Sequence, residues 1–249
     1  QPFSFERLIE RTQQLAKQPY QPPREVPAWL AQLPLDQHRQ IRFKKDQAVW
    51  ADSPSYQIQL YFPGAVYRTP VRVNTVDAGQ ARPVPLLPDM FDLGSVQLGG
   101  PLPPDLGLAG AYRFDVVARE HTQIDGAANL CFRADVEQVG LAALASMFFF
   151  GPNDRQGVDD FRSAVHDSGG LLIWTGKGDV LWRPLVNPTG LRLSVFADEN
   201  PRGFGLIQRS RSFEAYEDLE ARYDIRPNLW VAPRGTWGKG SVRLIEIPT

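Results

Sequence analysis

The chain has 249 residues, of which 43% are hydrophobic and 22% charged, and its net charge at pH 7 is −1. This composition is typical of a folded globular protein and excludes an intrinsically disordered one. The length fits one large all-β domain or two smaller ones. With no basic stripe to meet a phosphate backbone, nucleic acid is not an expected partner. Neutral ligands remain, and sugars are the commonest of the polar ones.

Cysteine usage and hydropathy exclude two further classes. The single cysteine, Cys131, has no partner for an internal disulfide and no metal-ligand spacing around it, so we expect a small buried apolar side chain. The longest apolar run, residues 141–150, is interrupted by Ser146 and is shorter than the ~20 residues of a membrane span. We therefore expect neither a disulfide framework nor a membrane helix.

The first 40 residues predict short helices. Apolar residues recur at helical spacing over residues 3–18, where Ser4 is a suitable N-cap and Pro19 ends the pattern. A second short helix follows, with Pro27 near its first turn. Both helices are expected to serve packing rather than chemistry.

Beyond residue 40 the apolar residues alternate with polar ones, which predicts β-strands. Turns rich in Pro, Gly and Asp separate these segments, among them residues 77–79, 176–179 and 187–190. Many strands without alternating helices favour an all-β fold, a large antiparallel β-sandwich with short N-terminal helices and a long cleft between curved sheets. The predicted strands are residues 40–43, 56–62, 71–76, 112–118, 129–136, 171–175, 192–196, 205–209 and 241–247.

No motif indicates a metal, serine or nucleotide enzyme. The three histidines form no metal-binding pair, there is no nucleophile elbow, and no glycine-rich phosphate loop is present. We expect no metal and no cofactor. Carboxylates, which glycosidases use in pairs, remain as candidates for catalysis.

Asp167 is the carboxylate of most interest, because it lies in an irregular turn beside His166 and before an apolar strand. It is either a turn aspartate that caps its own backbone or a catalytic base above a groove. The acidic run at residues 214–224 is expected to be a solvated helix face or turn.

Several tryptophans lie next to cationic residues late in the chain. Such neighbours suit either cation–π packing or a sugar subsite, since flat aromatic faces stack on sugar rings. Each tryptophan is otherwise an ordinary core residue. The pairs are Trp182 with Arg183, Trp230 with Arg226, and Trp237 with Lys239.

Taken in order, several strings of the chain resemble the osmoregulated periplasmic glucan biosynthesis proteins G and D. The resemblance covers nearly the whole chain, from Phe3-Ser4-Phe5 and the LGLAG string at 106–110 to the EIPT string at 246–249. Between them lie LASMFFFGPN at 144–153, HDS at 166–168, WRPL at 182–185, NPRGFGL at 200–206 and WGKGS at 237–241.

The resemblance implies export to the periplasm of Gram-negative bacteria and a role in making branched β-1,2-linked glucans. It also implies a large β-sandwich with a long cleft and a smaller immunoglobulin-like domain. Relatives are similar to inverting endo-β-1,2-glucanases, in which the aspartate of the HDS string, here Asp167, is the general base. Trp182, Arg183, Arg226, Trp230, Trp237 and Lys239 are then candidate cleft residues.

Two departures from the family pattern bear on function. The family separates Gly110 from Ala111 by a substantial segment, and it continues past Thr249 through an aspartate that is the general acid. We expect one sandwich domain over residues 1–249 with a segment missing at 110/111, no immunoglobulin-like domain, and a partner acid outside this chain.

Two functional hypotheses therefore remain: an inverting glucanase, and a non-catalytic protein that binds nascent glucan and assists its synthesis. A third hypothesis is a generic sugar-binding sandwich. The implied partners are β-1,2-glucan and a membrane glucosyltransferase, with a homodimer left open.

Overall fold

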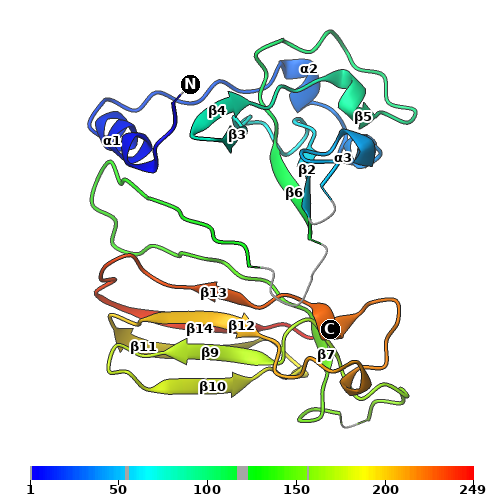
Figure 1. Ribbon diagram of the computed structural model, residues 1–249, viewed down its shortest axis with the longest axis vertical. Coiled ribbons are helices and arrows are strands. Elements are labelled where there is room, and N and C mark those ends of the chain that lie inside the picture. The colour runs from blue at the N-terminus through cyan, green and yellow to red at the C-terminus, as the bar shows by residue number, and fades with distance from the viewer. Residues whose placement is uncertain (1, 54–55, 117–122, 156) are drawn as a thin grey trace. The chain divides into compact units, whose positions relative to one another are not determined.

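The computed structural model describes residues 2–53, 56–116, 123–155 and 157–249 (Figure 1). The chain divides into two compact units, Gln1–Glu137 and Gln138–Thr249. Each unit is described separately below.

The first unit begins with the predicted helices. Helix α1 spans Phe5–Ala16, and its N-cap Ser4 accepts a hydrogen bond from the Arg7 amide at 3.2 Å, as expected for a capping serine. Helix α2 spans Ala28–Ala31 and follows Pro27. Both predictions are confirmed, whereas α3 (Leu35–His38) was not predicted. Two short 3₁₀ turns follow at Lys45–Gln47 and Pro88–Met90.

The strands described in the first unit form antiparallel pairs. Strand β1 (Arg42–Phe43) pairs with β5 (Phe91–Asp92), β2 (Tyr56–Tyr61) with β6 (Gly110–Val116), and β3 (Asn74–Asp77) with β4 (Gln80–Pro83). They enclose a core that includes Leu30, Leu60, Phe62, Phe91 and Leu108.

The β3–β4 hairpin follows directly from its turn sequence. Ala78 and Gly79 both have positive φ values, 48° and 72°, as a two-residue hairpin turn requires. The predicted turn at residues 77–79 is therefore confirmed.

The prediction of a strand at residues 129–136 is wrong. No strand pairs with this segment in the described part of the chain, and its apolar side chains Leu130, Phe132 and Val136 remain more than half exposed. A strand needs a neighbour for its backbone hydrogen bonds, so alternation alone did not make one here. Of the strand predicted at 112–118, residues 117–118 lie outside the described residues.

The second unit contains a four-stranded antiparallel sheet in the order β10-β9-β12-β13 (Figure 1). Its strands are β9 (Gly170–Trp174), β10 (Val180–Pro184), β12 (Gly203–Ile207) and β13 (Leu229–Val231). Strands β11 (Arg192–Glu199) and β14 (Lys239–Glu246) form a separate antiparallel pair, and β7 (Phe148–Phe150) pairs with β8 (Val165–His166). Phe213–Ala215 and Tyr223–Ile225 are 3₁₀ turns.

The core of the second unit joins two layers of strands. Leu171 and Ile173 of β9 and Leu206 of β12 pack with Val242 and Leu244 of β14 in one buried cluster. Since side chains alternate along a strand, Gly170, Leu172 and Trp174 face the other side of the four-stranded sheet. The all-β, antiparallel fold class is confirmed. The long cleft and the single domain over residues 1–249 stay predictions.

Candidate functional site

Asp167 lies at one end of the four-stranded sheet, between β8 and β9. Its amide donates a hydrogen bond to the Met147 carbonyl at 2.8 Å. Two residues later, the Gly169 amide donates to the Ile207 carbonyl at 2.9 Å. The Leu185 amide in turn donates to the Gly169 carbonyl at 3.1 Å. The backbone around the aspartate is thus held from three directions, which fixes the point from which its side chain extends.

The carboxylate of Asp167 is partly exposed and faces a cation. Its Oδ1 lies 3.3 Å from Nε of Arg226, and its side chain is 35% exposed. Arg226 is held by a bond from Nη2 to the Ala221 carbonyl at 2.8 Å and by packing over the Tyr223 ring at 5.6 Å. Nε of Arg226 makes no hydrogen bond in the described part of the chain, so the pair is a contact between charges. Such a carboxylate can still accept a proton from water or a hydroxyl group.

His166 supports the aspartate from the core. Its ring is 5% exposed, stacks on Phe148 at 5.1 Å and meets the edge of Tyr216 at 5.4 Å. Its carbonyl accepts a hydrogen bond from Gln208 at 3.2 Å. Burial lowers the pKa of His166 to about 4, although Asp167 and Gln208 act in the opposite direction. The imidazole is therefore neutral near pH 7 and acts in packing.

A pocket of about 390 Å³ opens beside His166. Gly170 lets Trp182 approach closely, because a Cβ at that position would lie only 2.4 Å from the indole ring. Among the residues that the structure describes, none that lines the pocket is acidic. The size and the mix of aromatic and polar walls are those of a small-molecule site. The lining residues are Pro152, Asn153, Ala164, His166, Gly169, Trp182, Pro184, Arg209, Ser210, Ala215 and Tyr216.

The six other predicted site residues divide among several places. Trp182 lines the pocket and Arg226 meets Asp167. Trp230 lies on the side of the sheet away from the core and is 43% exposed. Trp182 lies on β10, Trp230 lies on β13, and Arg226 lies in the turn before β13. All three therefore belong to the four-stranded sheet or to a turn that leads into it.

The remaining three do not join this group. Arg183 donates to the buried carboxylate of Glu246 at 3.0 Å. Trp237 packs edge-on against Phe204 at 6.0 Å, and Lys239 is exposed at the start of β14.

The acidic run at residues 214–224 is more buried than predicted. The run does form turns, but Asp218 and Asp224 are buried and bind Arg162 at 2.5 Å and Arg222 at 2.8 Å. Hydrogen bonds from the Ala221 amide and from Arg162 hold the pKa of Asp218 below its usual range. These two carboxylates therefore stabilise the loop.

Sequence reasoning missed several pocket residues. Asn153 lies inside a string that resembled the family, but nothing in that string indicated a pocket. Ser210 lies in a segment with no motif, and Tyr216 lies in the acidic run that was expected to be solvated; only the fold brings them to the pocket beside His166.

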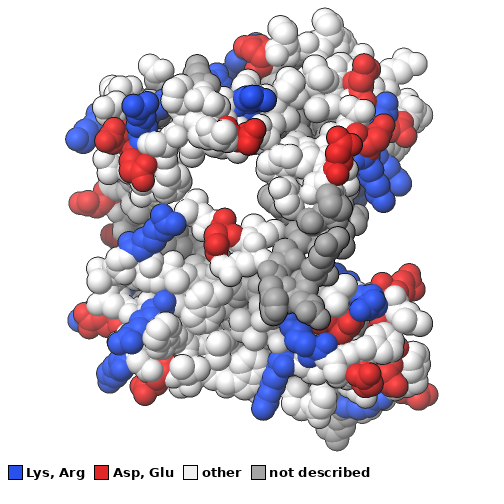
Figure 2. All heavy atoms as spheres, in the orientation of Figure 1, with Lys and Arg blue, Asp and Glu red and all other residues white. Residues whose placement is uncertain are grey.

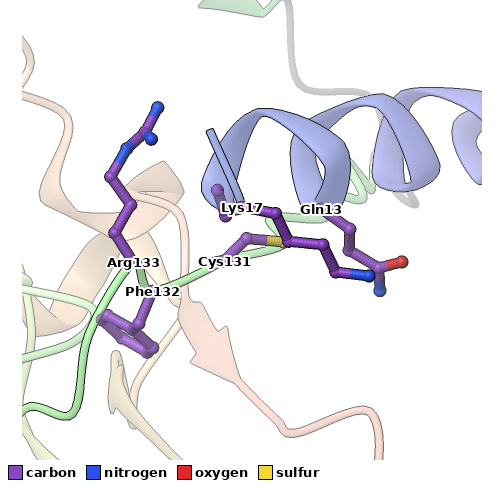
Figure 3. Close-up of a pocket in the computed structure, with 6 residues that line it drawn as sticks. Gln13, Lys17, Cys131, Phe132 and Arg133 are labelled. Carbon is purple, nitrogen blue, oxygen red and sulfur yellow. The ribbon is translucent and has the colours of Figure 1, made fainter. Parts of the chain in front are cut away.

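A second pocket, of about 650 Å³, lies in the first unit (Figure 3). Gln13 near the end of α1 and Lys17, the C-cap of that helix, lie beside Cys131, and Arg133 and Phe132 point away from each other. Cys131 is half-buried rather than buried as predicted. Because the Arg133 guanidinium donates to the Gln18 carbonyl at 2.5 Å, these residues tie α1 to the later segment.

Charge over the molecule is mixed. On the face shown in Figure 2, basic and acidic side chains are interspersed over both units. Within the described ranges no cluster of His, Cys, Asp and Glu is suited to a metal ion. The same residues include no helix that is both long and apolar enough to span a bilayer.

Comparison with known proteins gives consistent matches. A family model described as "Periplasmic glucan biosynthesis protein, MdoG" matches residues 3–110 and 107–249. Glucans biosynthesis protein G of Rhodopseudomonas palustris (strain BisA53) is 35% identical over 339 residues, covering 100% of this chain and 67% of the relative. The G protein of Vibrio cholerae serotype O1 is 34% identical, and the match covers 99% of this chain and 61% of the relative. Glucans biosynthesis protein D of Xylella fastidiosa (strain M12) is 34% identical, and the match covers 100% of this chain and 62% of the relative. The chain thus spans about two thirds, or slightly less, of the length of these relatives.

Proposed function

Because this chain belongs to the MdoG family of periplasmic glucan biosynthesis proteins, we propose that it binds glucan in the periplasm and takes part in glucan biosynthesis. The family predicted from the sequence is confirmed. The relatives are named for both the G and the D protein, and the pocket beside His166 combines an aromatic wall with neutral polar groups, as a sugar site requires.

We further propose that the substrate is β-1,2-linked glucan and that Asp167 is the general base of an inverting hydrolysis. The observation that carries this proposal is the Asp167 carboxylate, which extends from a hydrogen-bonded backbone, is partly exposed and directly follows His166, a residue that lines the pocket. A base that deprotonates water needs this combination of fixed position and access.

The reaction needs two carboxyl groups. Asp167 takes a proton from water as the water oxygen forms a bond to the anomeric carbon. A carboxylic acid on the other side protonates the glycosidic oxygen, whose bond to the anomeric carbon breaks. The family resemblance implies an aspartate in that role.

Replacing Asp167 by Asn tests the role directly. The variant keeps the size and packing of the side chain but cannot accept a proton, so hydrolysis of β-1,2-glucan should fall at least ~100-fold while glucan binding persists. Asp179→Asn, at an exposed position in the β9–β10 turn, is the matched control. The assay uses the full-length protein with all its carboxylates. Unchanged turnover in Asp167→Asn would exclude Asp167 as the base.

A second candidate function is non-catalytic glucan binding that assists a membrane glucosyltransferase. Two observations favour it. The pocket has no acidic residue among its described lining residues, and the buried carboxylates Asp218, Asp224 and Glu246 are each paired with an arginine. Glucan affinity without any product after long incubation of the full-length protein would select this function over hydrolysis. Co-purification with the glucosyltransferase and the measured mass in solution test the proposed partner and the homodimer.

A further inference from the structure

Three tryptophans share the outer face of the four-stranded sheet, opposite the core. Trp182 of β10 pairs with Leu172 of β9, which pairs with Gly205 of β12, which pairs with Trp230 of β13. Trp182 and Trp230 therefore stand in one row across four strands. At ~4.8 Å between strands, their backbones are ~14 Å apart. Trp174, two residues along β9 from Leu172, lies on the same side of the sheet. We call these three residues the tryptophan face.

Two glycines, Gly170 and Gly203, lie directly beneath two of these rings. A Cβ on Gly170 would lie 2.4, 2.6 and 2.8 Å from three neighbouring atoms of the Trp182 ring. A Cβ on Gly203 would lie 2.4, 2.7 and 3.0 Å from three neighbouring atoms of Trp230. Because three ring atoms are nearly equidistant in each case, each indole presents its flat side to the backbone. Its other flat side is directed away from the sheet.

The tryptophan face is open. Trp174 is 40% exposed and Trp230 is 43% exposed, although tryptophan is usually well buried. The guanidinium of Arg202 lies 5.3 Å from the centre of the Trp174 ring, which adds a hydrogen-bond donor at the margin. At the other end Trp182 also lines the pocket beside His166, next to Asn153 and Ser210.

We propose that the tryptophan face binds an extended, neutral glucan chain that runs across the strands from Trp230 to Trp182 and ends in the pocket. This proposal rests on the proposed function and names the surface that holds the chain. Flat aromatic faces stack on the apolar faces of sugar rings. Because Gly170 and Gly203 carry no side chain, the Trp182 and Trp230 rings can lie flat against the sheet. The pocket at the Trp182 end adds polar groups for hydroxyls, and one of its lining residues, His166, directly precedes Asp167 in the chain.

Binding of a linear β-1,2-glucan oligosaccharide, measured by isothermal titration calorimetry on the full chain, tests the proposal. Trp230→Ala should weaken binding about tenfold, which corresponds to ~1.4 kcal/mol. Trp50→Ala is the matched control, because Trp50 is 45% exposed but belongs to the first unit. It should bind as tightly as the wild type.

A second variant tests the geometry while every tryptophan is retained. Gly203→Ala pushes the Trp230 ring off the sheet and should weaken binding in the same direction. Gly240→Ala on β14, where a Cβ meets nothing within 4 Å, is its control and should bind normally. Circular dichroism establishes that both variants are folded.

The outcomes separate the two proposals. If the wild-type chain binds no glucan, the proposed function is overturned. If it binds, but Trp230→Ala and Gly203→Ala bind as tightly as their controls, the tryptophan face is overturned and the function stands. If Trp230→Ala instead dissociates a dimer and leaves glucan affinity unchanged, the face is a contact between copies of the chain and the proposal is wrong.

Discussion

The guanidinium of Arg226 lies with Nε 3.3 Å from Oδ1 of Asp167. The arginine lies in the turn before β13 and the aspartate in the turn before β9, so the pair links the entries to two strands of one sheet. Arg226 is itself fixed by the Ala221 carbonyl and the Tyr223 ring. The contact therefore restrains where the Asp167 carboxylate can point.

Replacing Arg226 by Gln should lower hydrolytic turnover more than glucan affinity. Without the cation the carboxylate of Asp167 can adopt other rotamers, so fewer molecules hold the base in place. We expect kcat to fall roughly tenfold, equivalent to ~1.4 kcal/mol of activation free energy, with KM within about twofold. Steady-state hydrolysis of β-1,2-glucan by the full-length protein measures both constants.

Arg226→Lys separates positioning from simple loss of structure. Lysine keeps the positive charge near Asp167 and should restore part of the lost kcat. A lysine variant as slow as the glutamine variant, or a change confined to KM, contradicts a positioning role for Arg226.

The stability of the second unit should depend on pH through His166. Burial lowers its pKa from 6.5 to about 4, so the unfolded chain binds a proton at a pH where the folded one does not. Protonation therefore favours unfolding as the pH falls from about 6.5 to about 4. Between pH 7 and pH 4.5 this should remove about 2–3 kcal/mol of stability.

Urea unfolding of His166→Phe at both pH values measures this effect. Phenylalanine keeps the stack on Phe148 but cannot take up a proton, so the variant should lose about 2–3 kcal/mol less than the wild type on acidification. Equal losses in the two proteins would show that other groups cause the acid sensitivity.

Elements that depend on local chemistry were predictable from the sequence. Ser4 and Pro19 bracket α1, and Ala78-Gly79 sets the β3–β4 hairpin, because caps and turns are satisfied by neighbouring residues. Strands β10 and β13 were missed. Both segments are short, with five residues in β10 and three in β13, which leaves little alternation to read even though β10 forms a hairpin with its neighbour β9.

The candidate site was predictable only in part. Asp167 and Trp182 lie in recognisable strings; Trp182 lines the pocket, and Asp167 directly follows His166, which also lines it. The pairing of Arg183 with Glu246 crosses between strands of separate sheets, so sequence neighbours could not reveal it. Trp182 and Arg183, adjacent in the chain, face opposite sides of β10 because side chains alternate along a strand.

The β9–β10 turn should tolerate no side chain at Gly176. A Cβ there would lie 1.9 Å from the Glu199 carbonyl oxygen and 2.9 Å from that of Asn200. Both are backbone atoms, so relief requires movement of the chain. Gly176→Ala should lower the free energy of unfolding by ~1–3 kcal/mol. Gly190→Ala, which meets nothing within 4 Å, should be neutral within ~0.5 kcal/mol. Equal stability of both variants by thermal unfolding would contradict the close approach.

The Arg183–Glu246 pair should contribute to stability rather than to glucan binding. Glu246 is 5% exposed and also accepts the Val186 amide at 2.9 Å. Arg183→Met would remove the closer and less exposed of the two arginines beside a buried carboxylate and should cost roughly 3 kcal/mol of unfolding free energy. Arg192→Met is the matched control. Arg192 is 54% exposed and 3.9 Å from the same carboxylate, so its loss should cost less than ~1 kcal/mol.

Chemical denaturation of the two methionine variants, with glucan titration in parallel, tests that assignment. Because Arg183 lies on the core side of β10, the glucan affinity of folded Arg183→Met should equal that of the wild type. A stable Arg183→Met protein with weakened glucan affinity would show that Arg183 takes part in glucan binding, as the sequence predicted. In that case the sugar contacts would extend to both sides of β10, and the tryptophan face would not be the whole binding surface.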